Sequence, residues 1–285
     1  MTSDKRLRPP IAILAVVASL SAGCAARVAP PVSPSSQPVQ QAAERKCEHG
    51  DRLVAGAFTY LNNQWGRDKV PAGETYEQCL VSRSAGDRTE YGWSFRWPGH
   101  EPSVYAYPEV LFGWSPWGGG LSSSLQFPMP VQGMADVTMT YEIESVVSGH
   151  YNLAFETWLM RTGGDGKSRP DDIAAEIMVW LDYDDTMRPS GSVVARVTID
   201  GIEYDLYKDE AGQAGRSWTY LAYLGPPRQL SGRLRLDAFV ADAVKRGYVF
   251  GGSYVTGVEL GNECAGGSGT TWVKRLHLAF ARPVE

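Results

Sequence analysis

Three segments of the 285-residue chain combine glutamate with aromatic or sulfur-containing side chains at the period of a β-strand. Successive residues of a strand point to opposite faces, so every second residue shares a face. The residues that share a face in this way are Glu156 and Trp158 in 152–160, Glu176, Met178 and Trp180 in 175–181, and Glu259 and Glu263 in 254–263. The opposite face of the segment 175–181 is aliphatic, which indicates a core on that side.

Carboxyl groups interleaved with aromatic rings suit a sugar-binding cleft. Rings stack on the apolar faces of sugars, and polar groups bond the hydroxyls. Two glutamates on facing strands also offer the pair that glycoside hydrolysis needs, one as nucleophile and one as acid and then base. The alternative is a solvated strand face whose glutamates pair with arginine or lysine, and the pattern alone does not decide between the two.

The rest of the chain must supply a scaffold of short strands. Glycine (31) and proline (18) recur at short intervals between alternating segments, which is typical of an all-β sandwich. A hydrophobic content of 43% is enough for a core, so most of the chain is not disordered. The glycine and proline content excludes a coiled coil, and a net charge of −5 argues against a nucleic-acid partner. Residues 235–247 have the apolar spacing of one amphipathic helix, which we expect to pack outside a sheet.

The N-terminus has the features of an export signal followed by a tether. Residues 1–23 combine a basic start, an apolar run and small residues, as in a secretory signal peptide. The residues before Cys24 resemble a lipobox, so we expect Cys24 to be lipidated, with plain secretion as the alternative. Residues 24–46 are rich in Pro, Ser and Gln and predict a flexible tether. The folded domain is expected over 47–285, in an exported protein that is anchored at the cell envelope, or else periplasmic or secreted.

Export also determines the expected state of the cysteines. If Cys24 is lipidated, three cysteines remain, so we expect one disulfide and one free thiol. Cys47 and Cys79 flank the first strand candidates and are the expected pair, which leaves Cys264 free. The sequence has no CxxC motif and no Cys/His cluster at metal-binding spacing, so we expect neither a metal nor a cofactor. We also expect a monomer.

At these residues the chain resembles glycoside hydrolase family 12, the endoglucanase family with a β-jelly-roll sandwich. The resemblance covers nearly the whole domain, and its features follow one another in order. They are Cys47 and Cys79 where many members have a disulfide, Asn62-Asn63-Gln64-Trp65-Gly66, Tyr107-Pro108-Glu109, Glu176-Ile177-Met178-Val179-Trp180, the helix, and Gly261-Asn262-Glu263. The resemblance implies a concanavalin-like jelly roll of two antiparallel sheets with one packed α-helix.

The resemblance also implies catalytic roles. Glu176 takes the place of the family's nucleophile, and Glu263 takes the place of its acid/base. Glu259 is the competitor for the second role, but the family's G-x-E position falls on Glu263. Glu156 stands where many members have an aspartate beside the nucleophile, so we expect a supporting role for it. Cys264 follows the acid/base where other members often have Pro or Phe, and we expect a buried free thiol there.

Further residues are implied to contact the substrate. Trp65 would be a stacking platform for sugars, with Asn63 bonding hydroxyls nearby; the alternative for Trp65 is a core tryptophan. Met178 and Trp180 would line the floor of the cleft. The expected substrate contacts are Asn63, Trp65, Tyr107, Trp158, Met178 and Trp180.

The sequence therefore predicts a retaining endo-acting hydrolase of β-1,4-glucosidic bonds in soluble or amorphous β-glucans. Retention requires the two catalytic carboxyl groups to lie about 5–5.5 Å apart. Cellulose, mixed-linkage glucan and xyloglucan are all open as the polymer. The alternatives are a non-catalytic carbohydrate-binding jelly roll anchored at the cell surface, and a structural or interaction protein.

Overall fold

The structure is a computed structural model that describes residues 44–99, 104–117, 119–120, 126–163, 170–210 and 216–280. The chain divides into the units Met1–Val39 and Gln40–Glu285, and every described residue belongs to the second unit. Cys24, the expected signal over 1–23 and most of the expected tether lie outside the described residues, so the expectations for them stay predictions. No described helix is long and apolar enough to cross a membrane.

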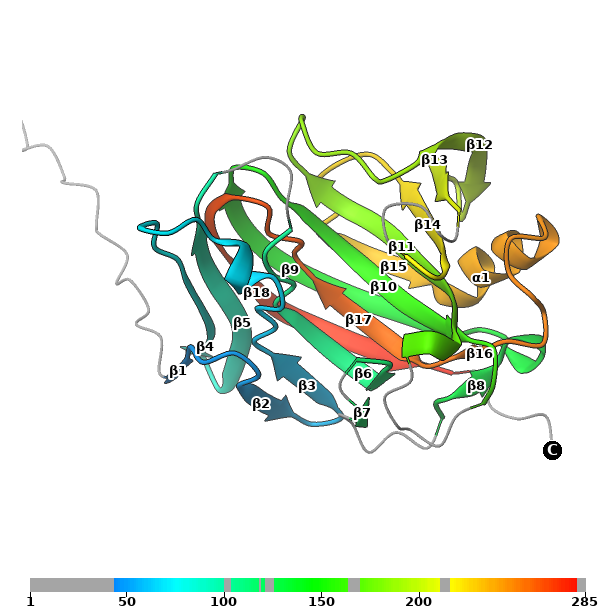
Figure 1. Cartoon of the computed structure of the whole chain (residues 1–285). Coiled ribbons are helices and arrows are strands. Elements are labelled where there is room, and N and C mark those ends of the chain that lie inside the picture. Colours follow the sequence, from blue (N-terminus) through cyan, green and yellow to red (C-terminus); the bar gives the residue numbers. More distant parts are fainter. Residues whose placement is uncertain are drawn as a thin grey trace, which may run out of the picture. The chain divides into compact units, whose positions relative to one another are not determined.

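Strands dominate the described part of the chain (Figure 1). The strands are β1 (Glu44–Lys46), β2 (Arg52–Ala55), β3 (Phe58–Leu61), β4 (Glu77–Ala85), β5 (Arg88–Trp97), β6 (Glu109–Ser115), β7 (Gly119–Gly120), β8 (Met129–Pro130), β9 (Thr138–Ser148), β10 (Asn152–Met160), β11 (Ile173–Tyr183), β12 (Ser192–Ile199), β13 (Ile202–Asp209), β14 (Thr219–Leu224), β15 (Ser231–Arg235), β16 (Tyr254–Val255), β17 (Gly257–Gly261) and β18 (Gly267–Ala279). The helices are α1 (Leu236–Lys245) and the 3-10 turns η1 (Arg67–Lys69), η2 (Val131–Gly133) and η3 (Pro170–Asp172).

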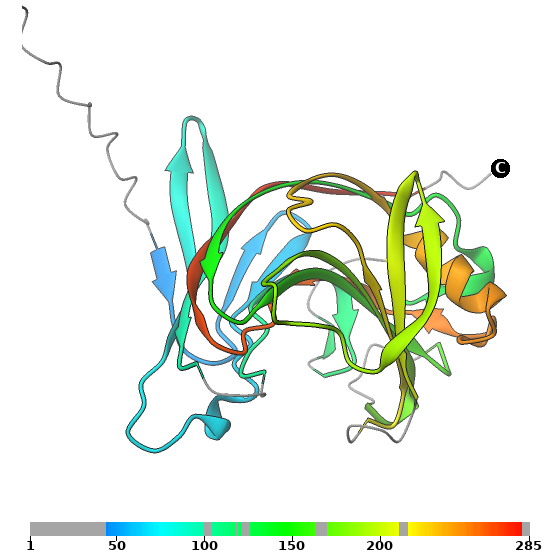
Figure 2. The same ribbon diagram turned by 90° about the horizontal axis from the view of Figure 1, so that it is seen from above.

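The strands form two sheets. The smaller sheet has the order β1-β4-β5-β18-β9-β15, and the larger has the main order β12-β13-β14-β11-β10-β17-β6-β3-β2 with β7, β8 and β16 attached. Figure 2 shows that the strands curve, with β10, β11 and β17 of the larger sheet on the inner side of the arch. The expected all-β sandwich of two sheets with one α-helix is confirmed for the described residues.

One pairing departs from the expected antiparallel sheets. β11 and β14 are parallel, whereas the other paired strands of the described residues are antiparallel. The β12–β13 hairpin lies between them in sequence, and β14 pairs antiparallel with β13 on its way back. The chain therefore returns beside β11 in the direction of β11, which brings the start of β14 next to the start of β11.

The core lies between the two sheets. Phe155 of β10 meets Tyr141 of β9 with ring centroids 5.1 Å apart, and the two strands belong to different sheets. Ile177 and Val179 of β11 also join this core. Because side chains alternate, burying these residues places Glu156 and Glu176 on the outer face of the larger sheet, as the sequence predicted.

The third glutamate-bearing segment is not one strand. β16 ends at Val255 and β17 runs only from Gly257 to Gly261, so Glu263 follows the strand and does not share a strand face with Glu259. Gly261 has a packing reason: a Cβ there would lie 2.7 Å from the Pro108 carbonyl oxygen and 2.8 Å from the Tyr107 ring. A side chain at position 261 would push away Tyr107 and Pro108, the residues that lead into β6.

The predicted helix is present as α1, and Gly247 (φ +74°) follows its last turn. Its apolar face is buried, with Phe239 and Tyr223 of β14 stacked edge to face at 4.9 Å. The Tyr223 hydroxyl donates to Asp242 at 3.0 Å, which fixes the helix against the sheet. The helix lies outside the sheets, as expected (Figure 2).

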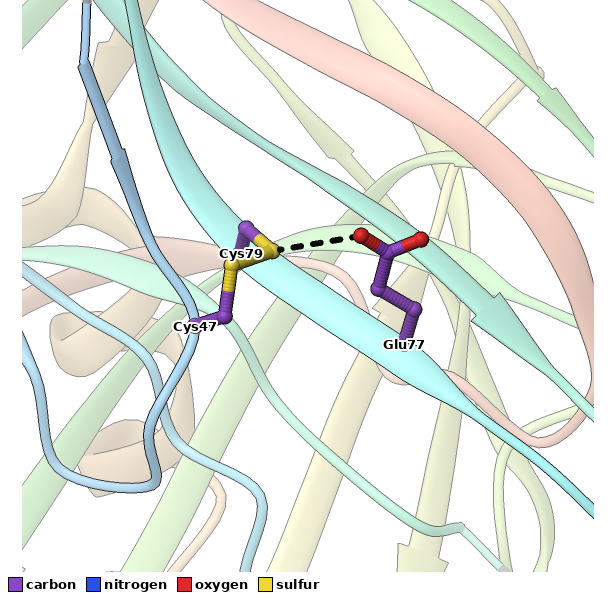
Figure 3. Close-up of side chains that lie close together, drawn as sticks. All are labelled: Cys47, Glu77 and Cys79. Carbon is purple, nitrogen blue, oxygen red and sulfur yellow. Dashed lines mark hydrogen bonds between the residues drawn. A yellow bond between two sulfur atoms is a disulfide. The ribbon is translucent and has the colours of Figure 1, made fainter.

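The cysteines are paired as predicted. Cys47 and Cys79 form a disulfide, and Cys264 is a buried free thiol. Figure 3 shows Glu77 beside the bridge, with a carboxylate oxygen 3.8 Å from the Cys79 sulfur. The bridge ties the segment after β1 to β4, which lies next to it in the smaller sheet.

We expect the double variant Cys47→Ala/Cys79→Ala to lose about 3 kcal/mol of unfolding free energy, because the bridge closes a loop with a sequence separation of 32 residues. Guanidinium unfolding of the variant and of the reduced wild-type protein measures this loss, and the two should agree. Non-reducing peptide mapping that finds Cys264 in a crosslink would contradict the assignment.

Candidate active site

Neighbouring strands place glutamates on one face of the larger sheet. In the strand register, Glu156 of β10 lies opposite Glu259 of β17 on one side and Met178 of β11 on the other. One step along β10, Trp158 lies opposite Glu176. The sequence positions that predicted carbohydrate chemistry are thus brought together on three adjacent strands.

Glu176 is 7% exposed and receives a hydrogen bond from the Trp218 indole, whose Nε1 lies 2.7 Å from Oε2. Burial raises the pKa of Glu176 to about 7 against the opposing effects of this hydrogen bond and the charge of Arg216. Glu263 and Glu259 raise it further by repulsion. The group is therefore poised to change protonation near neutral pH.

Glu263 is held by Asn152 at the start of β10. The Asn152 amide nitrogen donates to Oε2 of Glu263, and the Glu263 backbone N–H donates to Asn152 Oδ1 at 3.2 Å. Burial raises the pKa of Glu263, while the Asn152 hydrogen bond and the Arg216 charge lower it. Asn152 thus orients a side chain that the strand itself no longer positions.

Arg216 is the cation whose charge reaches both Glu176 and Glu263. Its guanidinium donates to Asp209 at 2.9 Å and lies 4.7 Å from the centroid of the Tyr220 ring. Tyr220 is the register partner of Glu176 across the parallel β11–β14 pair. The loop before β14 therefore carries a charged group to the glutamate face.

Glu156 is 6% exposed and lies between the other acids. Burial, followed by repulsion from Glu176 and Glu259, raises its pKa well above the usual carboxyl range. Its surroundings therefore favour the protonated form.

The expected substrate contacts differ in exposure. Trp65 is 51% exposed, with the Lys69 Nζ 4.2 Å from its ring centroid, so the core alternative is wrong. The Asn63 amide nitrogen donates to Glu109 Oε1 at 3.2 Å. The Tyr107 hydroxyl is tied to the Ala154 carbonyl oxygen at 3.1 Å.

Three of these residues are almost fully covered, on the same sheet face as Glu156 and Glu176. Trp158 is 6% exposed, and Met178 and Trp180 are 1% exposed. The Trp158 indole donates to Glu259 at 3.3 Å, and the Tyr220 hydroxyl lies 3.4 Å from the Met178 sulfur. The Trp180 indole N–H is buried without an acceptor among the described residues. Side chains this covered leave almost no surface for a sugar, unlike the exposed Trp65.

Sequence reasoning missed four residues of this site: Glu109, Asn152, Arg216 and Trp218. Glu109 carried a usable signal, because it is an acid directly before the apolar run Val110-Leu111-Phe112. Asn152, Arg216 and Trp218 carried none, since their contacts depend on which strands become neighbours.

One group of three possible metal ligands occurs among the described residues: Cys47, Glu77 and Cys79 (Figure 3). The two cysteines are joined in the disulfide, so neither can offer a thiolate. This group does not fit a metal site, and it lies on the other sheet from the glutamates.

The chain is similar to known glycoside hydrolases in both sequence and structure. The profile of Glycosyl hydrolase family 12 matches residues 56–279. The chain is 27% identical over 226 residues to Endoglucanase S of Pectobacterium parmentieri, covering 77% of this chain and 81% of that protein. It is 26% identical over 230 residues to the xyloglucan-specific endo-beta-1,4-glucanase A of Emericella nidulans, covering 79% and 86%.

Two solved structures share the fold. A family 12 xyloglucanase from Bacillus licheniformis, 24% identical, superposes with a TM-score of 0.73 over 83% of this chain and 99% of that chain. The endoglucanase Cel12A from Rhodothermus marinus, 27% identical, gives 0.68 over 84% and 100%. The match to the profile spans most of the chain, and both structures belong to the jelly-roll family that the sequence resembles. The prediction of a glycoside hydrolase is thus confirmed: this chain belongs to glycosyl hydrolase family 12.

Proposed function

We propose that the protein is a retaining endo-β-1,4-glucanase that acts on soluble or amorphous β-glucans, with Glu176 as nucleophile and Glu263 as acid and base. The observation that carries the proposal is that each of the two carboxyl groups is held by an N–H donor, Glu176 by Trp218 and Glu263 by Asn152, while the charge of Arg216 favours the ionised form of both. The relatives named as endoglucanase and xyloglucan-specific glucanase support this substrate class.

The two carboxyl groups need opposite protonation states at the start of the reaction. Repulsion and burial disfavour two charges, so the pair retains one proton near neutral pH. The Trp218 N–H bond and Arg216 both stabilise the ionised form of Glu176. Catalysis in these roles requires Glu263 to carry the proton that the leaving oxygen takes up.

The reaction proceeds in two displacements. The ionised Glu176 attacks the anomeric carbon while Glu263 gives its proton to the glycosidic oxygen, so one C–O bond forms as the other breaks. Glu263, now a carboxylate, takes a proton from water, and the water oxygen releases the sugar from Glu176. Glu156 supports this cycle as a protonated neighbour that adds no negative charge beside the nucleophile.

The substrate contacts and the location of the protein belong to the same proposal. The half-exposed Trp65 ring is available for sugar stacking, and Asn63 lies near it in sequence with a fixed amide. The N-terminal sequence supports export and a lipid anchor on Cys24, and we propose that the enzyme acts as a monomer at the cell envelope.

We expect the purified enzyme to release reducing ends from soluble β-1,4-glucans, with the β-anomer appearing first in NMR spectra of the products. Glu176→Gln should lower turnover by about three orders of magnitude or more, because a neutral amide cannot attack. Glu203→Gln, a 65% exposed acid of β13, is the control and should keep wild-type turnover. First release of the α-anomer would contradict the retaining mechanism.

Glu263→Ala and Glu259→Ala distinguish the acid/base from its competitor. We expect Glu263→Ala to be nearly inactive on polysaccharide but to turn over an activated aryl cellobioside when azide is added, giving a β-glycosyl azide. Azide enters where the missing carboxyl group stood. Glu259→Ala should show a milder loss without azide rescue, and rescue of this variant alone would exchange the two roles.

Arg216→Met should move the acidic limb of the kcat/KM profile to higher pH. Arg216 lowers the pKa of Glu176, so its removal raises that pKa, and the ionised nucleophile then forms only at higher pH. Arg216→Lys should restore part of the shift. Arg196→Met, whose 65% exposed arginine pairs with Asp205, is the control. An acidic limb that stays in place in Arg216→Met would show that the charge does not act on the nucleophile.

A further inference from the structure

Two buried carboxyl groups beside the catalytic pair have no assigned role. Glu109 of β6 and Glu259 of β17 are 3% and 4% exposed and come from strands that pair directly. Arginine and lysine do not contribute to the electrostatics of either group among the described residues. Burying two negative charges without a cation would cost several kcal/mol for each ion.

Each group uses one of its oxygens to accept an N–H bond. Asn63 Nδ2 donates to Glu109 Oε1 at 3.2 Å, and Trp158 Nε1 donates to Glu259 Oε2 at 3.3 Å. The Ser115 hydroxyl also bonds to Glu259. The other oxygens, Glu109 Oε2 and Glu259 Oε1, are buried and receive no donor from the described residues.

The register pairs Glu109 with Gly261, two residues from Glu259 on β17, so the two side chains are diagonal neighbours on one face of the sheet, within reach of forming a hydrogen bond to each other. Two ionised carboxylates cannot do so, because both are acceptors only; one of them must carry a proton. A shared proton satisfies both remaining oxygens and removes one of the two charges. A single added proton thus offers a partner to the two oxygens that no described donor reaches.

A bound cation is the other occupant that two carboxylates could share. Among the described residues, no third acid, histidine or cysteine brings a ligand atom together with those of this pair. A calcium ion takes six to eight oxygen ligands, far more than two side chains supply. A proton needs only the two oxygens that face each other.

We propose that Glu109 and Glu259 are a proton-sharing pair that fixes the Asn63 amide and the Trp158 indole, so that Glu259 is a positioning residue of the active site. Asn63 follows β3, and Trp158 lies on β10, two strands beyond β6 in the larger sheet. The pair thus links two expected substrate contacts across the strands between them. This role rests on the proposed function only for its effect on substrate.

The groups around the pair favour keeping the proton. The titratable side chains whose pKa the pair raises are Tyr107 before β6, Glu156 on β10, which lies opposite Glu259, and Glu176 on β11, which Glu259 affects. All of them are acids, so a second negative charge would find no attraction. Burial and the facing carboxyl group raise the pKa of Glu109 well above its usual range, and burial raises that of Glu259.

Glutamine variants separate a shared proton from other arrangements. In Glu109→Gln, the amide oxygen accepts from Asn63 and the amide nitrogen donates to an ionised Glu259, so every bond remains. The same holds in reverse for Glu259→Gln, with Trp158 as the donor. In the double variant the two NH2 groups face each other, and one must turn away from its acceptor or leave Asn63 or Trp158 unpaired.

Guanidinium unfolding of the wild type, both single variants and the double variant at pH 5, 7 and 9 tests this. A carboxyl group whose pKa is raised by folding makes the folded protein less stable as the pH rises from the group's unfolded pKa, about 4.3, through its folded pKa. Each single variant should therefore become more stable relative to the wild type as the pH rises. At pH 9 its guanidinium midpoint should exceed that of the wild type. The double variant should have a lower midpoint than either single variant.

Glu90→Gln is the matched control. Glu90 is also 3% exposed, but it pairs with Arg83 and Arg88 at 2.8 Å, and these hold its pKa low. This variant should lose stability at pH 7 and pH 9. The contrast between two equally buried acids shows that the result reflects the partner and not burial alone.

Kinetics provide the second measurement. On a soluble β-glucan, the double variant should raise KM by more than the product of the two single-variant factors, because Asn63 or Trp158 loses its acceptor. Single variants that lose stability relative to the wild type as the pH rises would overturn the shared proton. So would a double variant whose shift in guanidinium midpoint equals the sum of the two single-variant shifts. If the double variant does not fold, the pH trend of the single variants still decides. Unfolding does not need turnover, so the proposal can fail or hold independently of the substrate.

Discussion

The burial of several carboxyl groups on one sheet face is the constraint on which the site depends. Burial raises the pKa of each of them, because the charged form loses water, and repulsion adds to the effect for most of them. The group comprises Glu109, Glu156, Glu176 and Glu259 on the sheet, with Glu263 just beyond the end of β17. The face therefore tolerates little negative charge at neutral pH. N–H donors on neighbouring strands and one arginine decide which oxygens bear the charge that remains, so identical side chains acquire different chemistry.

A cluster of buried acids destabilises the fold, and the hydrophobic core on the opposite face of the same strands offsets this loss of stability. Phe155, Ile177 and Val179 lie in the core between the sheets, which fixes the register of β10 and β11. A slip of one residue would bury the glutamates in that core and expose its aliphatic side chains, so the register is strongly specified. The hydrophobic sandwich thus holds the acids together at positions they would leave if the strands were free to move.

The sequence allowed prediction of those parts of the site that follow from alternation. Glu156 and Glu176 fall on the predicted face because each lies within one regular strand. Glu263 does not follow this rule, because β17 ends at Gly261 and a hydrogen bond from Asn152 orients the side chain instead. The Cys47–Cys79 pair could be inferred because both cysteines flank the first strand candidates and the count leaves one cysteine over. The burial of Met178 and Trp180 and the contacts of Glu109 could not, since they depend on neighbours from distant parts of the chain.

Arg216 shows most clearly how topology supplies what local sequence cannot. It precedes β14, and β14 reaches β11 only because the β12–β13 hairpin intervenes and sends the chain back in the parallel direction. The same segment brings Trp218 to Glu176. Asp209 neutralises part of the arginine charge and, with the Tyr220 ring, fixes the guanidinium in place. A cation held in this way contributes a directed field to two carboxyl groups without forming an ion pair that would lock either of them in its ionised form. The acids can therefore exchange a proton during catalysis, which a direct salt bridge to the nucleophile would oppose.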